Sequence, residues 1–220
     1  MTNSTSTRKQ ILGGAGPIRQ YIFAWCFSRF SRRAEAYLAP HKSRLFHGLS
    51  GVVLEIGPGS GTNLAYLDAH SAKWIGVEPN PFMHPYLAKT ARDLGIEIDI
   101  RDSIAEELPV RDASVDAVIA TLVLCSVTNQ VRVVSEVLRV LKSGGKFLFI
   151  EHVAAPRGTW LRRIQEWITP LWRRMADGCC PERETAHVIE SAGFREVKIE
   201  SFDAPLPVVK PHIAGAAVKA

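Results

Sequence analysis

Several features are missing from this 220-residue sequence, and each absence excludes a class of protein. No run of about 18 uncharged apolar residues occurs, so no membrane-spanning helix is predicted. Only four cysteines are present, and none of them forms a C-x-x-C pair. Neither a disulfide framework nor a metal site is therefore predicted, zinc included, and a reducing, cytoplasmic compartment is expected. Residues 1–10 are rich in Ser and Thr but lack the apolar core of a signal peptide.

Acidic residues are also outnumbered, because 27 Lys and Arg against 22 Asp and Glu give a net charge of +5. Much of this excess lies in residues 19–44 and 157–174, where arginines alternate with aromatic residues. We expect Trp160, Trp167 and Trp172 to form an apolar wall for a lipophilic ligand. The arginines would then favour an anionic ligand or a membrane surface. The alternative is an amphipathic helix with a solvated basic face.

The most informative segment is a glycine-rich turn that follows a short apolar strand. Residues 52–56 have the composition of a buried strand, and Gly57, Gly59 and Gly61 come directly after it. Glycine has no Cβ atom, so a ligand can lie against the backbone of this turn. Glu78 closes the next predicted strand, where nucleotide-binding β-α-β units place a carboxylate that binds ribose hydroxyls. The segment therefore predicts a ligand that contains a ribose.

The glycine spacing indicates which ribose ligand this is. A dinucleotide-binding loop reads G-x-G-x-x-G and would need glycine at position 62, where Thr62 stands. Here the glycines read G-x-G-x-G behind Glu55, and Glu78 ends the second strand. This pattern resembles the class I S-adenosylmethionine (SAM) methyltransferases, and the resemblance implies SAM as the cofactor.

Strands and helices alternate along the chain, which predicts an α/β fold with helices on both faces of a mostly parallel sheet. The resemblance implies the Rossmann-like class I methyltransferase fold, with seven strands, an antiparallel last strand and an N-terminal helical lid. Residues 1–16 are expected to be a disordered tail and 17–220 a single domain, with a helical cap at 17–50 and a catalytic core at 51–220. The predicted strands are 52–57, 73–78, 96–101, 115–121, 146–152, 197–202 and 213–218. The predicted helices are two within 17–50, then 62–69, 81–94, 131–141 and one near 182–192. The segment 143–145 is predicted to terminate the helix at 131–141.

The resemblance also implies roles for individual residues around the methionyl part of SAM. Backbone groups of Gly57 and Gly59 would approach this part, and the helix after Gly61 would direct its N-terminal dipole at the carboxylate. Glu55 would either hold the ammonium group or position the loop. Glu78 would accept two hydrogen bonds from the ribose hydroxyls.

At the adenine end the sequence departs from its relatives, which commonly read Asp-Ala-Glu-x-Leu-Pro. Ile104 stands at the position of that Asp. Asp102 or backbone groups of 103–105 would replace it, and the alternative role for Asp102 is an N-cap of a short turn. The full set of expected cofactor contacts is Glu55, Gly57, Gly59, Gly61, Asn63, Glu78, Asn80, Asp102, Ser103, Ile104 and Thr121.

Four segments in the second half of the chain indicate a particular family within this class of methyltransferases, namely 121–127, 151–155, 177–179 and 210–213. They are similar to the methyltransferase-like 7 family, whose members are thiol S-methyltransferases that act on small lipophilic thiols. This implies a small lipophilic acceptor, most simply a thiol, with O-, N- or C-methylation of a quinol or phospholipid as the alternative. A peripheral contact with a membrane surface is a further expectation.

Nucleic-acid methylation is the remaining alternative, because the isoelectric point is about 9.2. Enzymes that methylate base nitrogens carry an Asn/Asp-Pro-Pro-aromatic loop after the fourth strand. Residues 121–124 read Thr-Leu-Val-Leu instead, with no polar group to hold a base nitrogen. No nucleic-acid partner is therefore expected.

Two residues are candidates for orienting or deprotonating the acceptor. His152 ends the fifth predicted strand, at the edge of the sheet where α/β proteins bind ligands. Asp177 precedes a glycine in a predicted turn, and its alternative role is turn formation. Cys125 is expected to be a buried, inert thiol, and the pair Cys179 and Cys180 carries no metal spacing.

Overall fold

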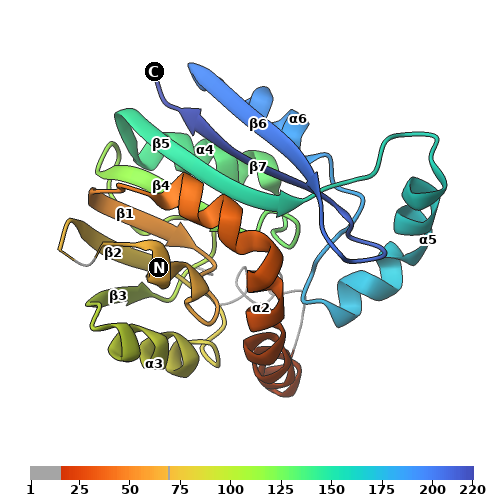
Figure 1. Ribbon diagram of the computed structural model, residues 1–220, viewed down its shortest axis with the longest axis horizontal. Coiled ribbons are helices and arrows are strands. Elements are labelled where there is room, and N and C mark those ends of the chain that lie inside the picture. The colour runs from red at the N-terminus through yellow and green to blue at the C-terminus, as the bar shows by residue number, and fades with distance from the viewer. Residues whose placement is uncertain (1–15, 69) are drawn as a thin grey trace, which may run out of the picture.

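The computed structural model describes residues 16–68 and 70–220, so the predicted tail lies outside the described residues except for Gly16. One seven-stranded sheet forms the centre of the protein, in the order β3-β2-β1-β4-β5-β7-β6 (Figure 1). β7 is antiparallel to both of its neighbours, whereas all other neighbouring strands are parallel. The expected fold class is confirmed. The strands are β1 Gly51–Ile56, β2 Ala72–Val77, β3 Ile98–Arg101, β4 Val115–Thr121, β5 Leu141–His152, β6 Glu196–Asp203 and β7 Pro211–Val218.

Helices cover both faces of this sheet. In Figure 1, α2 crosses the near face, whereas α4 and α6 lie behind the sheet and α5 stands apart from it. A short 3-10 helix, η1, follows β1 and contacts both α2 and α3. The helices are α2 Pro17–Phe46, η1 Thr62–Tyr66, α3 His84–Leu94, α4 Gln130–Val140, α5 Trp160–Met175 and α6 Thr185–Glu190.

Alternation along the strands divides the core between the two faces. Val53 faces α2 and packs in a cluster with Leu38 and Phe46. Its neighbour Leu54 points to the opposite face, into the larger cluster that contains Val133 and Val137 of α4. Successive residues of a strand point to opposite faces, so a strand with helices on both sides is apolar throughout. This explains why 52–56 reads as a continuous apolar run.

Three predicted elements differ in the structure. Residues 17–50 hold one 30-residue helix rather than two, with Pro40 inside it. Proline removes one helical hydrogen bond, but the helix continues because Leu38 and Phe46, on either side of Pro40, are both buried against the sheet. Residues 62–69 form only the five-residue η1, in which the Asn63 side chain turns inward. No α-helix dipole therefore follows Gly61.

The third difference concerns the end of α4. The segment 143–145, which reads Ser-Gly-Gly, predicts the end of this helix, but the helix already ends at Val140 and the chain passes directly into β5. The pairing of β4 with β5 shifts register between Val115 and Ala117, and Gly144 has a φ of +75° in the irregular start of β5. The glycines therefore serve a bulge and not a helix cap.

Candidate active site

The sheet has a topological switch between β1 and β4, because the chain runs outward from β1 in both directions. Open α/β sheets bind ligands at the carboxyl ends of the strands beside such a switch. A cavity of about 220 Å³ lies there. It is lined by the ends of β1, β2 and β4, by residues 104–106, 121–123 and 126–128, by the start of α2 and by the loop after α5.

The glycine-rich turn forms one wall of this cavity. Gly57 has a φ of +60° and Gly59 a φ of +55°, backbone conformations that favour glycine. A Cβ atom on Gly57 would lie 2.7 Å from Val123 Cγ2, and one on Gly59 would lie 2.9 Å from Phe27 Cε1. Both positions therefore need glycine for two reasons, the left-handed backbone and the space. This is a cradle in which a ligand can approach the main chain closely.

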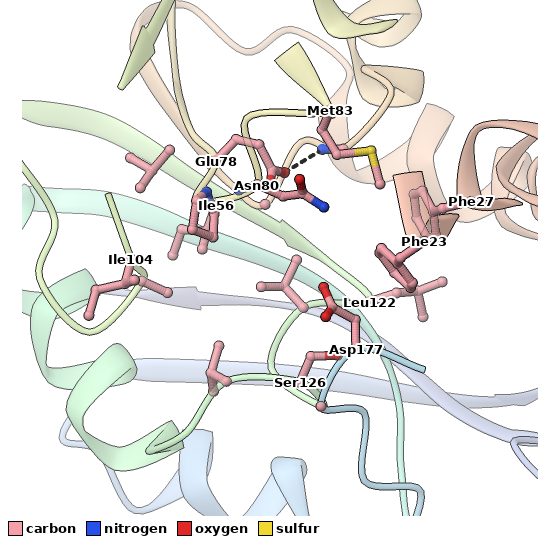
Figure 2. A pocket seen from close by; sticks show the side chains of 18 of the residues that line it. Phe23, Phe27, Ile56, Glu78, Asn80, Met83, Ile104, Leu122, Ser126 and Asp177 are labelled. Atoms are coloured by element: carbon pink, nitrogen blue, oxygen red, sulfur yellow. Dashed lines mark hydrogen bonds between the residues drawn. The ribbon is translucent and has the colours of Figure 1, made fainter. Parts of the chain in front are cut away.

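Glu78 follows the end of β2 and is only 6% exposed. Its Oε2 accepts a hydrogen bond from Gly59 N at 3.0 Å, and its Oε1 accepts one from Asn80 N at 2.9 Å (Figure 2). Burial raises the pKa of Glu78 to about 7, although these backbone N–H groups oppose the shift. The two bonds hold the carboxylate in a fixed orientation at the cavity, and each oxygen keeps a second lone pair for a ribose hydroxyl.

Glu55 lies behind the glycine turn and not in the cavity. Its carboxylate accepts hydrogen bonds from Asn63 Nδ2 and Trp74 Nε1, both at 2.9 Å. Asn63 also donates to Thr121 Oγ1 at 3.0 Å, so this network ties β1, η1 and β4 together. Burial raises the pKa of Glu55 to about 7. Of the two roles left open by the sequence, the geometry supports the positioning of the loop.

The adenine side of the cavity is lined by Ile104, Ala105 and Glu106. Asp102 is exposed and does not line the cavity, and the Ser103 hydroxyl donates to the carbonyl of Glu107. Glu106 accepts hydrogen bonds from Thr128 N and Asn129 N, which fixes the loop after β4 against this wall. The structure therefore places Ile104, rather than Asp102, against the expected adenine.

Asp177 lies across the cavity from Ile104 (Figure 2). Figure 2 shows its carboxylate pointing into the cavity near Leu122. Asp177 has a φ of +47° and Leu122 a φ of +56°, conformations that non-glycine residues seldom adopt and that concentrate at functional sites. Burial raises the pKa of Asp177, and Arg19, 3.6 Å away, opposes this shift.

His152 is placed differently from Asp177. It is buried and does not line the cavity, and its Nε2 lies 3.0 Å from Cys179 Sγ. Trp172 Nε1 also donates to this sulfur, at 3.3 Å. The neighbouring Cys125 thiol and then His152 lower the pKa of the Cys179 thiol. His152 thus lies behind the residues that line the cavity, because the strand end that carries it is covered by the loop after α5.

The expectation that Trp160, Trp167 and Trp172 form an apolar wall for the ligand is wrong, because none of the three lines the cavity. Trp160 is 77% exposed and Trp167 is 84% exposed, and neither lines the cavity. Phe23 and Phe27 of α2 supply aromatic rings instead (Figure 2).

Of the expected cofactor contacts, the cavity is lined by Gly57, Gly59, Glu78, Asn80, Ile104 and Thr121. Glu55, Gly61, Asn63, Asp102 and Ser103 do not line it. Arg19 and Arg173 also line the cavity, and both belong to the two arginine-rich segments expected beside the ligand. Gln20, Phe23, Phe27, Met83 and Arg183 line it without having been among the candidate site residues. The only signal for the α2 residues was the alternation of arginine and aromatic residues.

Comparison with known proteins identifies the cofactor and the family. Residues 54–149 match a family model described as a methyltransferase domain. Human thiol S-methyltransferase TMT1A is 38% identical over 90% of this chain and 86% of its own length. Human thiol S-methyltransferase TMT1B is 33% identical over 95% of this chain and 91% of its own.

A solved structure shows the same fold. The YcgJ protein of Bacillus subtilis superposes with a TM-score of 0.62 at 18% identity, covering 83% of this chain and 97% of that one. The glycine cradle and the Glu78 carboxylate fit a SAM molecule, whose ribose needs an acceptor and whose methionyl part needs close approach to the backbone. This chain therefore belongs to the class I SAM-dependent methyltransferases, in the family that contains the thiol S-methyltransferases TMT1A and TMT1B.

Proposed function

We propose that this methyltransferase transfers the methyl group of SAM to a small lipophilic thiol. The observation that carries the proposal is that the apolar side chains of Phe23, Phe27 and Leu122 line the same cavity as the carboxylate of Asp177 (Figure 2). The relatives named thiol S-methyltransferases support the same acceptor, because they match nearly the whole chain.

The proposed chemistry needs little more than alignment and one proton acceptor. SAM supplies a methyl group on a sulfonium, which is already a good leaving group. The thiolate is the nucleophile, so the S–H proton must leave the acceptor. Asp177 is the carboxylate that faces the acceptor and can take this proton. Transfer of the methyl group from SAM to the thiolate would give a thioether and S-adenosylhomocysteine, and Phe23 and Phe27 would provide an apolar surface that positions the acceptor.

S-adenosylhomocysteine release by the purified protein would test this proposal on an acceptor panel: an alkyl thiol, hydrogen sulfide, a catechol, a quinol and phosphatidylethanolamine micelles. We expect release with the alkyl thiol. Asp177→Asn should lower kcat by about 100-fold or more, the typical contribution of a positioned base, with SAM affinity unchanged. Release only with the quinol or the lipid would contradict the thiol acceptor and leave methyl transfer intact.

We also propose that the protein works at the cytosolic surface of an anionic membrane. α5 carries an exposed apolar stripe with the spacing of one helix face, made of Trp160, Ile164, Trp167, Leu171 and Met175. Arg163 lies over the Trp160 ring at 5.3 Å, and Arg174 is also exposed. Apolar residues flanked by arginines fit the boundary between acyl chains and anionic headgroups. Among the described residues, no helix is both long and apolar enough to cross a bilayer.

Co-sedimentation with vesicles tests the membrane proposal. We expect the protein to pellet with phosphatidylcholine vesicles that contain phosphatidylserine, and to be released at high salt. The double substitution W160S/W167S should reduce this binding. Leu94→Ser, at an exposed apolar residue of α3, is the matched control and should bind as the wild type does. Equal binding of both variants, or no binding of the wild type, would contradict the proposal.

A further inference from the structure

Two thiols and one imidazole from three separate segments meet behind the acceptor side of the cavity. Cys125 lies in the loop after β4, His152 ends β5, and Cys179 lies in the loop after α5. Their donor atoms all lie within 4.8 Å of one another, and His152 Nε2 is 3.0 Å from Cys179 Sγ. The spacing of these residues along the chain shows no metal pattern, so the sequence predicted no metal site here.

Two of the three residues in this cluster are buried, and Cys179 is half-buried. Cys125 is 2% exposed and His152 is 5% exposed. Among the described residues, His152 Nδ1 is buried without a hydrogen-bond partner. The ring nitrogen directed at the sulfurs is Nε2, so Nε2 is the atom available to a metal ion, and Nδ1 would then carry the ring proton.

We propose that Cys125, His152 and Cys179 bind a zinc ion. Zinc takes thiolate sulfur at about 2.3 Å and imidazole nitrogen at about 2.0 Å, which separates neighbouring ligand atoms by roughly 3.5 Å in a tetrahedral site. The donor atoms of the cluster, all within 4.8 Å of one another, are close enough to share one such ion. Two thiolates and a neutral imidazole also leave a zinc site with no net charge, which favours a buried position. Calcium and magnesium prefer oxygen ligands and do not fit this donor set.

The surroundings of the cluster suit a metal site in one further respect. Trp172 Nε1 donates to Cys179 Sγ at 3.3 Å, a contact of the kind that orients and stabilises a ligand sulfur. Three protein ligands leave a fourth zinc position for water or another ligand.

The zinc ion would tie together the three segments that build the acceptor side. Ser126, next to Cys125, and both Asp177 and Gly178, just before Cys179, line the cavity. The ion would therefore hold Asp177 at a fixed place relative to β5. This inference does not depend on the acceptor being a thiol.

Metal content of the protein, purified with a reductant and without a chelator, tests the inference. We expect a stoichiometric amount of zinc by elemental analysis. Replacement by Co²⁺ should give the sulfur-to-cobalt charge-transfer band and the intense visible bands of a tetrahedral site. Cys125→Ser and Cys179→Ser should each lose most of the metal. Cys180→Ser is the matched control, because Cys180 is buried next to Cys179 but lies outside the cluster, and it should keep the metal.

A measurement on the wild type keeps the test valid if a variant fails to fold. Alkylation followed by peptide mass spectrometry should show Cys125 and Cys179 protected when zinc is bound and reactive after chelation, with Cys26 and Cys180 unaffected by the chelator. The inference is overturned if the wild type takes up neither zinc nor Co²⁺. It is equally overturned if Cys125 and Cys179 are found joined as a disulfide in the purified protein.

Discussion

The Glu78 carboxylate accepts hydrogen bonds from the backbone N–H groups of Gly59 and Asn80, which aim it at the cavity. Burial raises its pKa to about 7, so at neutral pH a proton competes with a ribose for the same oxygens. Ribose hydroxyls donate to the anionic form, so SAM favours the deprotonated carboxylate. The ionisation of one residue is therefore linked to cofactor affinity.

From this linkage we predict that SAM affinity rises with pH through about 7 and then levels off. Because the folded pKa lies above the ordinary value, the carboxylate carries a proton below about pH 7, and affinity should fall there by up to about tenfold per pH unit. Isothermal titration calorimetry between about pH 6 and pH 8 measures this. Glu78→Gln should bind SAM about 10–100-fold more weakly at the upper pH.

The amino group of SAM titrates in an overlapping pH range and also contributes to the pH dependence of binding. The Glu78→Gln variant is therefore the control that separates the two contributions. Glu78→Gln keeps the contribution of the amino group and loses the one from residue 78. An identical pH profile in the wild type and the variant would show that Glu78 does not govern cofactor binding.

Gly57→Ala tests the glycine cradle. The φ of +60° should cost about 1–2 kcal/mol in an alanine, and the new Cβ would lie 2.7 Å from Val123 Cγ2. We expect lower stability in urea unfolding together with weaker SAM binding. Gly144→Ala is the matched control, since Gly144 has a φ of +75° but no heavy atom within 4 Å of the position that a Cβ would take. It should share the loss of stability and keep SAM affinity. A Gly57→Ala variant with normal SAM binding would contradict the cradle.

Among the elements, α4 shows most directly how local sequence and packing agree. Asn129 begins the helix as its N-cap, with its side chain accepting a hydrogen bond from Arg132 N at 3.1 Å. Val133, Val137 and Val140 then bury one face against β5 and α6. The cap is a preference of the sequence, whereas the stability of the helix comes from packing.

For α4, we predict that Asn129→Ala lowers the free energy of unfolding by about 1 kcal/mol, because the N–H of Arg132 loses its acceptor. Urea unfolding followed by circular dichroism measures the change. Asn129→Ser keeps a capping oxygen and should recover most of the loss. Equal stability of the alanine and serine variants would mean that the side-chain cap does not contribute.

In the whole molecule, the cavity draws its walls from elements that are far apart in sequence, from the start of α2 to the loop after α5. A ligand that fills it therefore contacts most of the fold and should stabilise the whole chain. Thr62 and the G-x-G-x-G spacing argue against a dinucleotide in the same place.

We therefore predict a thermal shift with SAM and none with NAD. SAM at 100 times its Kd should add about 2.7 kcal/mol to the free energy of unfolding. For a chain of this size, that raises Tm by about 5–10 °C. Differential scanning fluorimetry measures the Tm of the protein with each of the two ligands. An equal shift with NAD would refute the interpretation of the glycine spacing.

The sequence by itself determined the sheet-forming segments, the glycine turn and the acid at position 78. These follow from the periodicity of apolar residues and from the special backbone of glycine, and both act within a few residues of the chain. Local signals misjudged α2 and η1, because burial of Leu38 and Phe46 carries the helix past Pro40, and the Glu55 and Thr121 contacts of Asn63 hold the shorter turn.

Only the tertiary structure decided which residues share a site. The insertion of β7 between β5 and β6, the lining of the cavity by Phe23 and Phe27, and the meeting of Cys125, His152 and Cys179 all depend on contacts between distant segments. Such contacts arise from the packing of helices and loops against the sheet. The spacing of the contacting residues along the chain therefore does not predict them. The exposure of Trp160 and Trp167 has the same origin, because α5 lies away from the sheet with its apolar stripe unpacked.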